Sequence, residues 1–208
     1  MAKRYYKKLR EFPEGIDHLE AEVRLPIDEE QIEVLLETYF LGGNMKPTVG
    51  YLILKYGLWE EAMNIGRHGK PRIAFRATWV LEWAYEQSSP DELPEWFADR
   101  MADDFAASSN GSLHRVYAKM LCDQMRFGDF SPTGAQAEKL AEKCFDLVID
   151  PKTKTAVTFW CLEVLSELAP RVDWVAGELE ETVRRISESP GCTPGIAVAC
   201  REILKRLK

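Results

Sequence analysis

The stretch Lys70–Gln87, KPRIAFRATWVLEWAYEQ, decides the fold. Pro71 suits the start of a helix, because its missing N–H would have no intrahelical partner in a first turn. At 100° per residue, five apolar side chains gather on one face, and two arginines with two tryptophans form a stripe roughly opposite. A helix that is apolar on nearly all sides packs between neighbours. The apolar face holds Ile73, Ala77, Val80, Leu81 and Ala84, and the stripe holds Arg72, Arg76, Trp79 and Trp83.

This pattern returns twice further along the chain. Trp79-Val80-Leu81-Glu82 is echoed by Trp160-Cys161-Leu162-Glu163, and Met120-Leu121 stands at the corresponding place between them. Leu81 and Leu121 are 40 residues apart, and Leu121 and Leu162 are 41 apart. A recurrence of this length is typical of stacked helical repeats. The sequence therefore predicts an array of helical hairpins.

Glycine and proline divide the chain into segments of helical period, with no alternation typical of strands. Residues 1–26 show no period, and we interpret them as an extended or partly disordered arm. Residues 27–208 are predicted to form a single all-α domain of about ten helices. The expected helices cover 28–41, 47–56, 58–67, 71–87, 91–107, 112–127, 135–149, 153–169, 173–188 and 193–208.

Three helix starts carry capping signals. Asp28 and Gln31 predict a capping box, with Ile27 and Ile32 as its hydrophobic staple. Ser89-Pro90-Asp91-Glu92 predicts that the helix over 91–107 begins directly after the serine. Asp173 is predicted to cap the helix that follows it.

Composition limits the chemistry. The chain has 208 residues and a net charge of −7, with no apolar run long enough to cross a bilayer. Its five cysteines include no CxxC pair and mostly occupy apolar helical positions, so we expect buried, reduced thiols in a cytoplasmic protein. The three histidines lie far apart, and no metal, P-loop or nucleophile motif occurs. His114 is interpreted as an exposed first-turn residue. We predict no metal, no cofactor and no catalytic residue.

The period and the paired helices from residue 28 onward resemble the HEAT/armadillo family of helical repeats. This resemblance implies a right-handed α-α superhelix of stacked antiparallel hairpins. Most members of such families are protein-binding scaffolds, so it also implies a non-enzymatic interaction role with a protein or basic peptide as partner. Fold-level likeness is by itself a weak argument for function.

Two enzymatic alternatives stay open. HEAT-type DNA alkylation-repair glycosylases resemble the expected fold and use Trp, Asp and Arg around a lesion. No local match in this sequence assigns those roles to particular residues, and the acidic net charge disfavours contact with phosphates. Separately, the stripe of Arg72, Arg76, Trp79 and Trp83 offers guanidinium and indole groups that could hold a base or a nucleotide. The structural interpretation is that the tryptophans fill gaps between helices. The second alternative is a small-molecule enzyme with an unrecognised pocket.

Charge separates by helix type. The first helices of the hairpins (71–87, 111–127, 153–169 and 193–208) carry a net +4, and the second helices (91–107, 133–149 and 172–188) carry −9. In a HEAT-type stack each set lines one side, so we predict an acidic concave face that attracts a basic segment. The basic stretch Lys3–Arg10 in the arm is an internal competitor for that face. The expected partner-binding residues are Glu95, Asp99, Asp103, Glu138, Glu142, Glu178 and Glu181.

Overall fold

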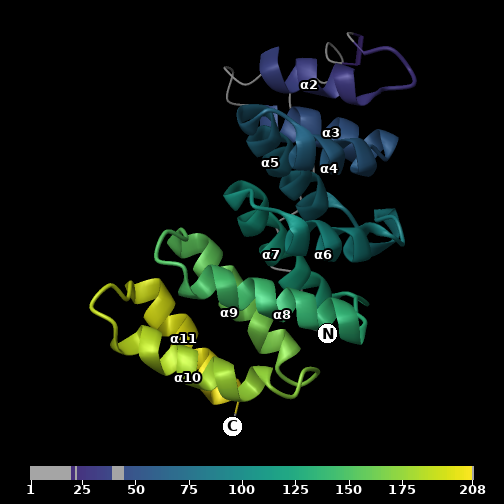
Figure 1. Ribbon diagram of the computed structural model, residues 1–208. Coiled ribbons are helices and arrows are strands. Elements are labelled where there is room, and N and C mark those ends of the chain that lie inside the picture. Colours follow the sequence, from purple (N-terminus) through teal and green to yellow (C-terminus); the bar gives the residue numbers. More distant parts are fainter. Residues whose placement is uncertain (1–19, 22, 39–44, 208) are drawn as a thin grey trace. The chain divides into compact units, whose positions relative to one another are not determined.

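A computed structural model of the chain describes residues 20–21, 23–38 and 45–207. This part of the chain contains ten α-helices, one short 3₁₀ helix and no strand, so the all-α prediction is confirmed (Figure 1). None of these helices is long and apolar enough to span a bilayer. The helices are α2 (Glu29–Thr38), α3 (Met45–Tyr56), α4 (Trp59–His68), α5 (Pro71–Gln87), η2 (Pro90–Glu92), α6 (Phe97–Ala107), α7 (Gly111–Phe127), α8 (Gly134–Ile149), α9 (Thr155–Leu168), α10 (Val175–Glu188) and α11 (Pro194–Arg206).

The chain divides into two compact units, one up to Phe97 and one from Ala98 onward. We call them the N-terminal and C-terminal units and describe each by itself. The single domain expected over 27–208 therefore stays a prediction. The predicted arm over 1–26, with its basic stretch Lys3–Arg10, lies almost wholly outside the described residues.

Helix α5 is the centre of the N-terminal unit. It packs against α3 and α4, and α2 contacts both α4 and α5. The predicted bounds of α5 and the proline at its start are confirmed. Its predicted apolar face is buried throughout, since Ile73, Ala77, Val80, Leu81 and Ala84 are all at most 6% exposed. Between α3 and α4 the chain turns at Gly57, whose φ of 68° lies in the left-handed region that favours glycine.

Gly50 of α3 lets α5 approach closely. A Cβ atom at this position would lie 2.5 Å from Cε3 of Trp83 and 3.2 Å from the carbonyl oxygen of Val80. Any larger residue must therefore push the tryptophan or the α5 backbone away.

Gly50→Ala should consequently lower the free energy of unfolding by about 1–3 kcal/mol, because the overpacking outweighs the gain of about 1 kcal/mol in helix propensity. The matched control is Gly177→Ala, also inside a helix but with no atom within 4 Å of the added Cβ. This control should stabilise the chain slightly. Urea unfolding followed by circular dichroism measures both, and stabilisation by Gly50→Ala would contradict the close packing of α3 and α5.

In the C-terminal unit, α7, α9 and α11 form one row of helices, since α9 contacts both of the others. Ion pairs between two arginines and two glutamates connect the three helices of this row. Arg126 of α7 donates to Glu163 at 2.7 Å and to Glu167 at 2.6 Å, both on α9, and Arg206 of α11 donates to Glu163 at 2.9 Å. Four charges that share hydrogen bonds hold three helices in register.

Polar contacts between helices join residues about one repeat apart. Arg126 and Glu167 are separated by 41 positions, Arg171 and Ser131 by 40, and Arg76 and the carbonyl of Leu36 by 40. The three leucines that defined the period, Leu81, Leu121 and Leu162, are all fully buried. Within each unit, therefore, segments that correspond in the sequence period lie beside one another.

The predicted helix over 91–107 is wrong at its start. Ser89 and Glu92 form the expected capping box, but only the 3₁₀ turn η2 follows, and α6 begins at Phe97. Pro94 is the cause. Its ring excludes the preceding residue from the helical region, and Leu93 has φ −87° and ψ 134°. Glu95 therefore precedes the helix instead of lying on it.

Two further capping predictions need correction. The side chain of Asp28 accepts the N–H of Gln31 at 2.9 Å as expected, but the Gln31 side chain turns back to the backbone of Arg24 and the carbonyl of Pro26. The Gln31 carboxamide therefore binds the segment before α2 and does not complete a capping box. Asp173 does not cap α10, whose N-cap position is Trp174 without a side-chain bond.

Candidate partner-binding face

The second row of the C-terminal unit consists of α6, α8 and α10. Gln136 Nε2 of α8 donates to Asp99 Oδ1 of α6 at 3.1 Å. Trp174 Nε1, at the start of α10, donates to Glu138 Oε2 of α8 at 2.7 Å. These contacts span 37 and 36 positions, about one repeat. The three helices predicted to carry the acidic face are therefore consecutive neighbours.

Helical period explains why acidic side chains cover the outer side of this row. Apolar residues at spacings of three and four face inward, such as Met101 and Phe105 on α6 and Leu179 and Val183 on α10, all fully buried. The positions between them point to solvent. All six predicted carboxylates on the row are exposed, namely Asp99, Asp103, Glu138, Glu142, Glu178 and Glu181. Glu95 is also exposed, but it belongs to the other compact unit.

Intramolecular partners occupy half of these carboxylates. Asp99 and Glu138 accept the two bonds between helices, and Glu181 pairs with Arg185 at 2.5 Å along α10. In the described residues no ion pair engages the other three, Asp103, Glu142 and Glu178. Pairs between exposed charges contribute only about 0–1 kcal/mol. The face therefore keeps most of its negative charge available to a partner.

An aromatic pair lies among these carboxylates. The rings of Phe145 and Trp174 have their centroids 5.5 Å apart, and Trp174 is 39% exposed. Its N–H is held by Glu138, so the indole is fixed while part of its surface meets solvent. Our reasoning from the sequence missed this pair. The signal in the sequence was Trp174 itself, because it directly precedes Val175, the first buried residue of α10, at a position where no large apolar side chain is needed for the core.

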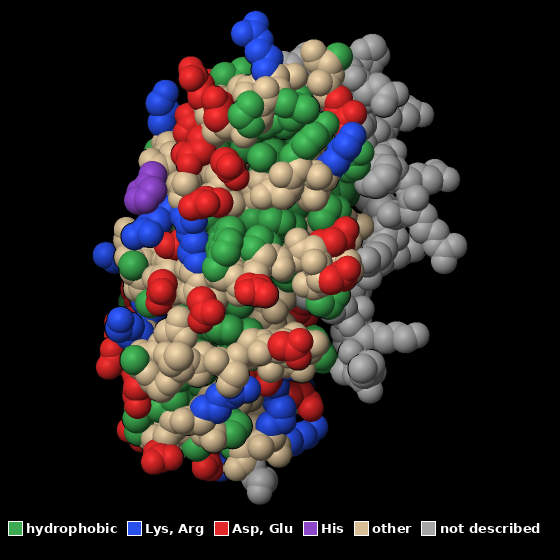
Figure 2. Space-filling model, turned by 90° about the vertical axis from the view of Figure 1, so that its right-hand side faces the viewer, with side chains coloured by type: hydrophobic (Ala, Val, Ile, Leu, Met, Phe, Trp, Pro, Cys, Tyr) green, Lys and Arg blue, Asp and Glu red, His purple; other side chains and the backbone are tan. Residues whose placement is uncertain are grey.

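Acidic side chains are dispersed on the face of the molecule drawn in Figure 2, where Asp and Glu form small separate groups among hydrophobic, neutral and basic side chains. A partner with several spaced cations matches such a surface better than a single bulky cation does.

The Arg/Trp stripe on α5 does not form one surface. Arg72 is exposed, whereas Arg76 is 1% exposed and donates Nη1 to the carbonyl of Leu36 at 2.6 Å. Trp83 is 8% exposed and Trp79 is 37% exposed. The end of α2 and the backbone of α3 cover the alternate members of the stripe. The prediction that both tryptophans fill gaps between helices is therefore wrong for Trp79.

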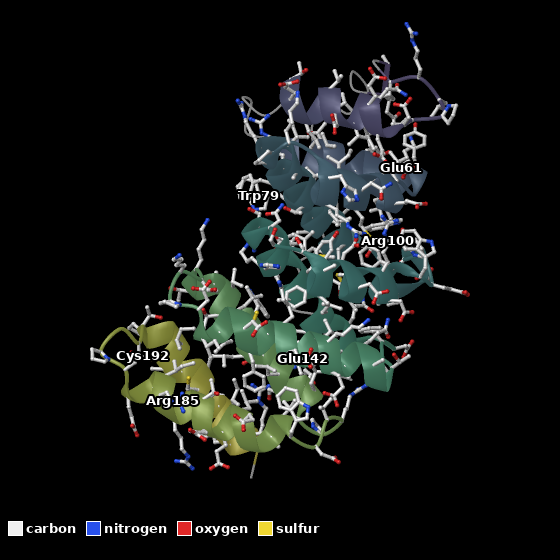
Figure 3. All side chains as sticks on the ribbon, viewed as in Figure 1. Glu61, Trp79, Arg100, Glu142, Arg185 and Cys192 are labelled. Carbon is white, nitrogen blue, oxygen red and sulfur yellow. The ribbon has the colours of Figure 1, made fainter. Side chains whose placement is uncertain are left out.

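Trp79 instead forms an exposed pair with Phe75, one turn earlier on α5. Their ring centroids are 5.2 Å apart, and both side chains are 37% exposed. In Figure 3, Trp79 lies at the left-hand edge of the ribbon of the N-terminal unit. Trp160, its counterpart in the sequence period, is half-buried and packs edge-on against Phe159 at 5.0 Å. The corresponding positions thus share aromatic character but differ in exposure.

The reactive side chains in the described ranges are mostly buried. Four of the five cysteines are buried, as predicted, and all five are free thiols. Burial raises the pKa of Cys122 to about 12 and that of Cys200 to about 11. Thiols with such pKa values are protonated at neutral pH and are poor nucleophiles. No group of three His, Cys, Asp or Glu side chains in residues 20–21, 23–38 and 45–207 is arranged to hold a metal ion.

The prediction that His114 is exposed is wrong. Its side chain is 3% exposed, packs edge-on against Phe105 with 5.4 Å between ring centroids, and bonds through Nε2 to the carbonyl of Ser108 at 2.8 Å. The loop between α6 and α7 folds back over the first turn of α7 and buries the ring. A position in a first turn is exposed only where no other segment covers it.

The chain matches no protein-family model, no curated protein sequence and no solved structure. The chemistry of the described side chains is therefore the basis for an inference about function.

Proposed function

We propose that the chain is a non-enzymatic interaction scaffold, built as an α-α superhelix of HEAT-like hairpins, that binds a basic protein segment. The contacts between residues one repeat apart and the two rows of helices in the C-terminal unit support the architecture. Repeats of this kind stabilise one another through neighbouring contacts and present an extended row of helices to a partner.

The observation that carries the binding role is the outer side of α6, α8 and α10. Exposed carboxylates lie on three adjacent helices, and one of them, Glu138, fixes the partly exposed indole of Trp174. A lysine or arginine side chain can pair with a carboxylate there and pack on the face of Trp174. Complementary charge raises the rate of encounter, and a buried aromatic residue often supplies much of the affinity at an interface. The preferred partner is therefore an extended segment rich in Lys and Arg.

The Arg/Trp stripe, the surface that could have held a base, does not support the DNA-repair alternative. Arg76 is buried and bonded to a backbone carbonyl, so it is not placed to contact a phosphate. Affinity for nucleic acid depends mainly on phosphate contacts, and the chain as a whole carries −7. We therefore favour the scaffold role over the glycosylase role.

The test is binding of a fluorescent Lys/Arg-rich peptide to the full chain at low salt. The variant carries Asp103→Asn, Glu142→Gln and Glu178→Gln, the three carboxylates outside any described ion pair. We expect the affinity to fall about tenfold, since each exposed pair contributes up to about 1 kcal/mol. The difference should fade near 0.5 M salt because charges are screened.

A matched variant, Glu30→Gln with Glu60→Gln and Asp129→Asn, changes the net charge equally at exposed positions outside the row. It should bind like the original chain. Equal loss in both variants would mean that only the overall charge attracts the peptide, and the proposed face would be wrong. Tight, salt-sensitive binding of duplex DNA with an abasic site would favour the repair enzyme instead.

A further inference from the structure

A cavity of about 230 Å³ opens in the C-terminal unit, away from the carboxylates discussed above. Its walls come from the start of α7, the end of α8 and the loop that leads from α8 into α9. The residues that matter for its chemistry are His114, Asp150, Lys152, Thr153 and Lys154. The volume is smaller than the roughly 300–1,000 Å³ of a pocket for a drug-sized ligand. It suits one small charged group.

Positive charge dominates the lining. Lys152 and Lys154 are exposed at the mouth, and no ion pair among the described side chains neutralises either of them. Asp150 is the only carboxylate among the lining residues, and its Oδ1 already accepts the N–H of Lys152 at 2.9 Å. Two lysines and one carboxylate that is partly satisfied by the backbone therefore line the cavity.

Two helices add to this charge. Both α7 and α9 begin at the cavity, and neither has an acidic residue in its first turn. The N-cap position of α9, Lys154, makes no side-chain capping bond. The first N–H groups of a helix have no intrahelical acceptor and carry a partial positive charge. Part of this donor capacity is already used, because Asn110 accepts the N–H of Ser112 at 3.0 Å in α7 and the carbonyl of Lys154 accepts the N–H of Val157 at 2.8 Å in α9. The positive ends of the two helix dipoles therefore add to the charge of the lysines.

His114 forms the inner wall. Its Nε2 bonds to a carbonyl oxygen, which can only accept, so Nε2 carries the proton. Burial is the main cause that lowers the pKa of this imidazole from its usual 6.5, and the charge of Lys143 lowers it further, whereas the bond to Ser108 opposes the shift. The ring is therefore neutral at pH 7. A bound anion would favour the protonated ring and raise its pKa.

We propose that this cavity binds a small phosphate-type anion through Lys152 and Lys154, at the positive ends of α7 and α9. The ligand is inorganic phosphate or the phosphate group of a small phosphomonoester. The site uses none of the residues assigned to the basic peptide, so it stands or falls independently of the proposed scaffold role.

The experiment is a titration of the full chain with inorganic phosphate, glycerol 3-phosphate and uncharged glycerol, followed by NMR of the histidine side chains. We expect both phosphates to shift the His114 resonances and raise the pKa of His114. Glycerol should have no effect. His68, exposed at the end of α4 in the other unit, is the internal control and should not respond. Binding of only one phosphate compound identifies the source of the group.

The variant Lys152→Ala with Lys154→Ala should weaken phosphate binding at least about tenfold, because each lysine supplies a charge-assisted hydrogen bond. Lys139→Ala, an exposed lysine on α8, is the matched control and should bind like the original chain. Circular dichroism verifies that each variant is folded. A double variant that binds as tightly as the control, or phosphate that shifts His68 as much as His114, would overturn the proposal and indicate an adventitious ion only.

Discussion

Trp83→Ala should lower the free energy of unfolding by about 3–5 kcal/mol, whereas Trp79→Ala should lower it by about 1 kcal/mol or less. The two residues lie one turn apart on α5 and belong to the same stripe of the sequence. Trp83 is 8% exposed and packs over Gly50 of α3, so its removal leaves a large cavity. Trp79 is 37% exposed, and the Phe75 ring against which it packs is itself 37% exposed.

Urea unfolding followed by circular dichroism measures both changes, and amide hydrogen exchange in α3 and α5 shows whether the loss lies in the N-terminal unit. The matched pair separates packing from residue type, because the same side chain is removed from the same helix. Equal losses would mean that Trp79 is covered in solution. A small loss for Trp83 would contradict the close packing of α3 against α5.

Arg76→Ala should cost about 3 kcal/mol. The buried guanidinium bonds to the carbonyl of Leu36 at 2.6 Å and to that of Glu37 at 3.4 Å. Both carbonyls lie in the last turn of α2, where the carbonyl oxygens have no N–H donor within the helix. Hydrogen bonds from a charged group contribute about 1.5–3 kcal/mol, and the aliphatic stem adds packing. The variant should therefore loosen α2 from α5.

The control for Arg76 is Arg72→Ala, one turn earlier on the same helix and exposed. It should change stability by about 0.5 kcal/mol or less. Arg76→Met distinguishes the hydrogen bonds from the packing of the stem, since methionine keeps much of the volume but cannot donate. Exchange of the α2 amides is the second measurement. Arg76→Ala with α2 as protected as in the original chain would show that this helix end does not depend on the guanidinium.

Most helix bounds, and the residues that share one side of each helix, could be predicted from the sequence. The bounds of α5 follow from Pro71 and from the apolar period, because both act within one segment. The helix predicted over 193–208 likewise begins where expected, with the side chain of Thr193 accepting the N–H of Ile196. The placement of the acidic side chains of α6, α8 and α10 on the sides of the helices away from the core positions also follows from the period. A period fixes which residues share a side of a helix.

The start of the helix predicted over 91–107 is wrong, although the sequence itself contains the signal that corrects it. Pro94 already indicates that Leu93 cannot be helical, yet the strong start at Ser89–Glu92 favoured one uninterrupted helix. The local rule was sufficient there, and Glu95 could have been separated from the acidic row without a structure.

The tertiary structure decided what covers each face. Arg72, Arg76, Trp79 and Trp83 share one stripe by period, but the end of α2 covers the second and the backbone of α3 covers the fourth. His114 is buried because the preceding loop folds over it, and Lys152 and Lys154 line the same cavity as His114 only through the packing of three helices. Coverage depends on segments tens of residues away, and the helical period within one segment carries no information about them.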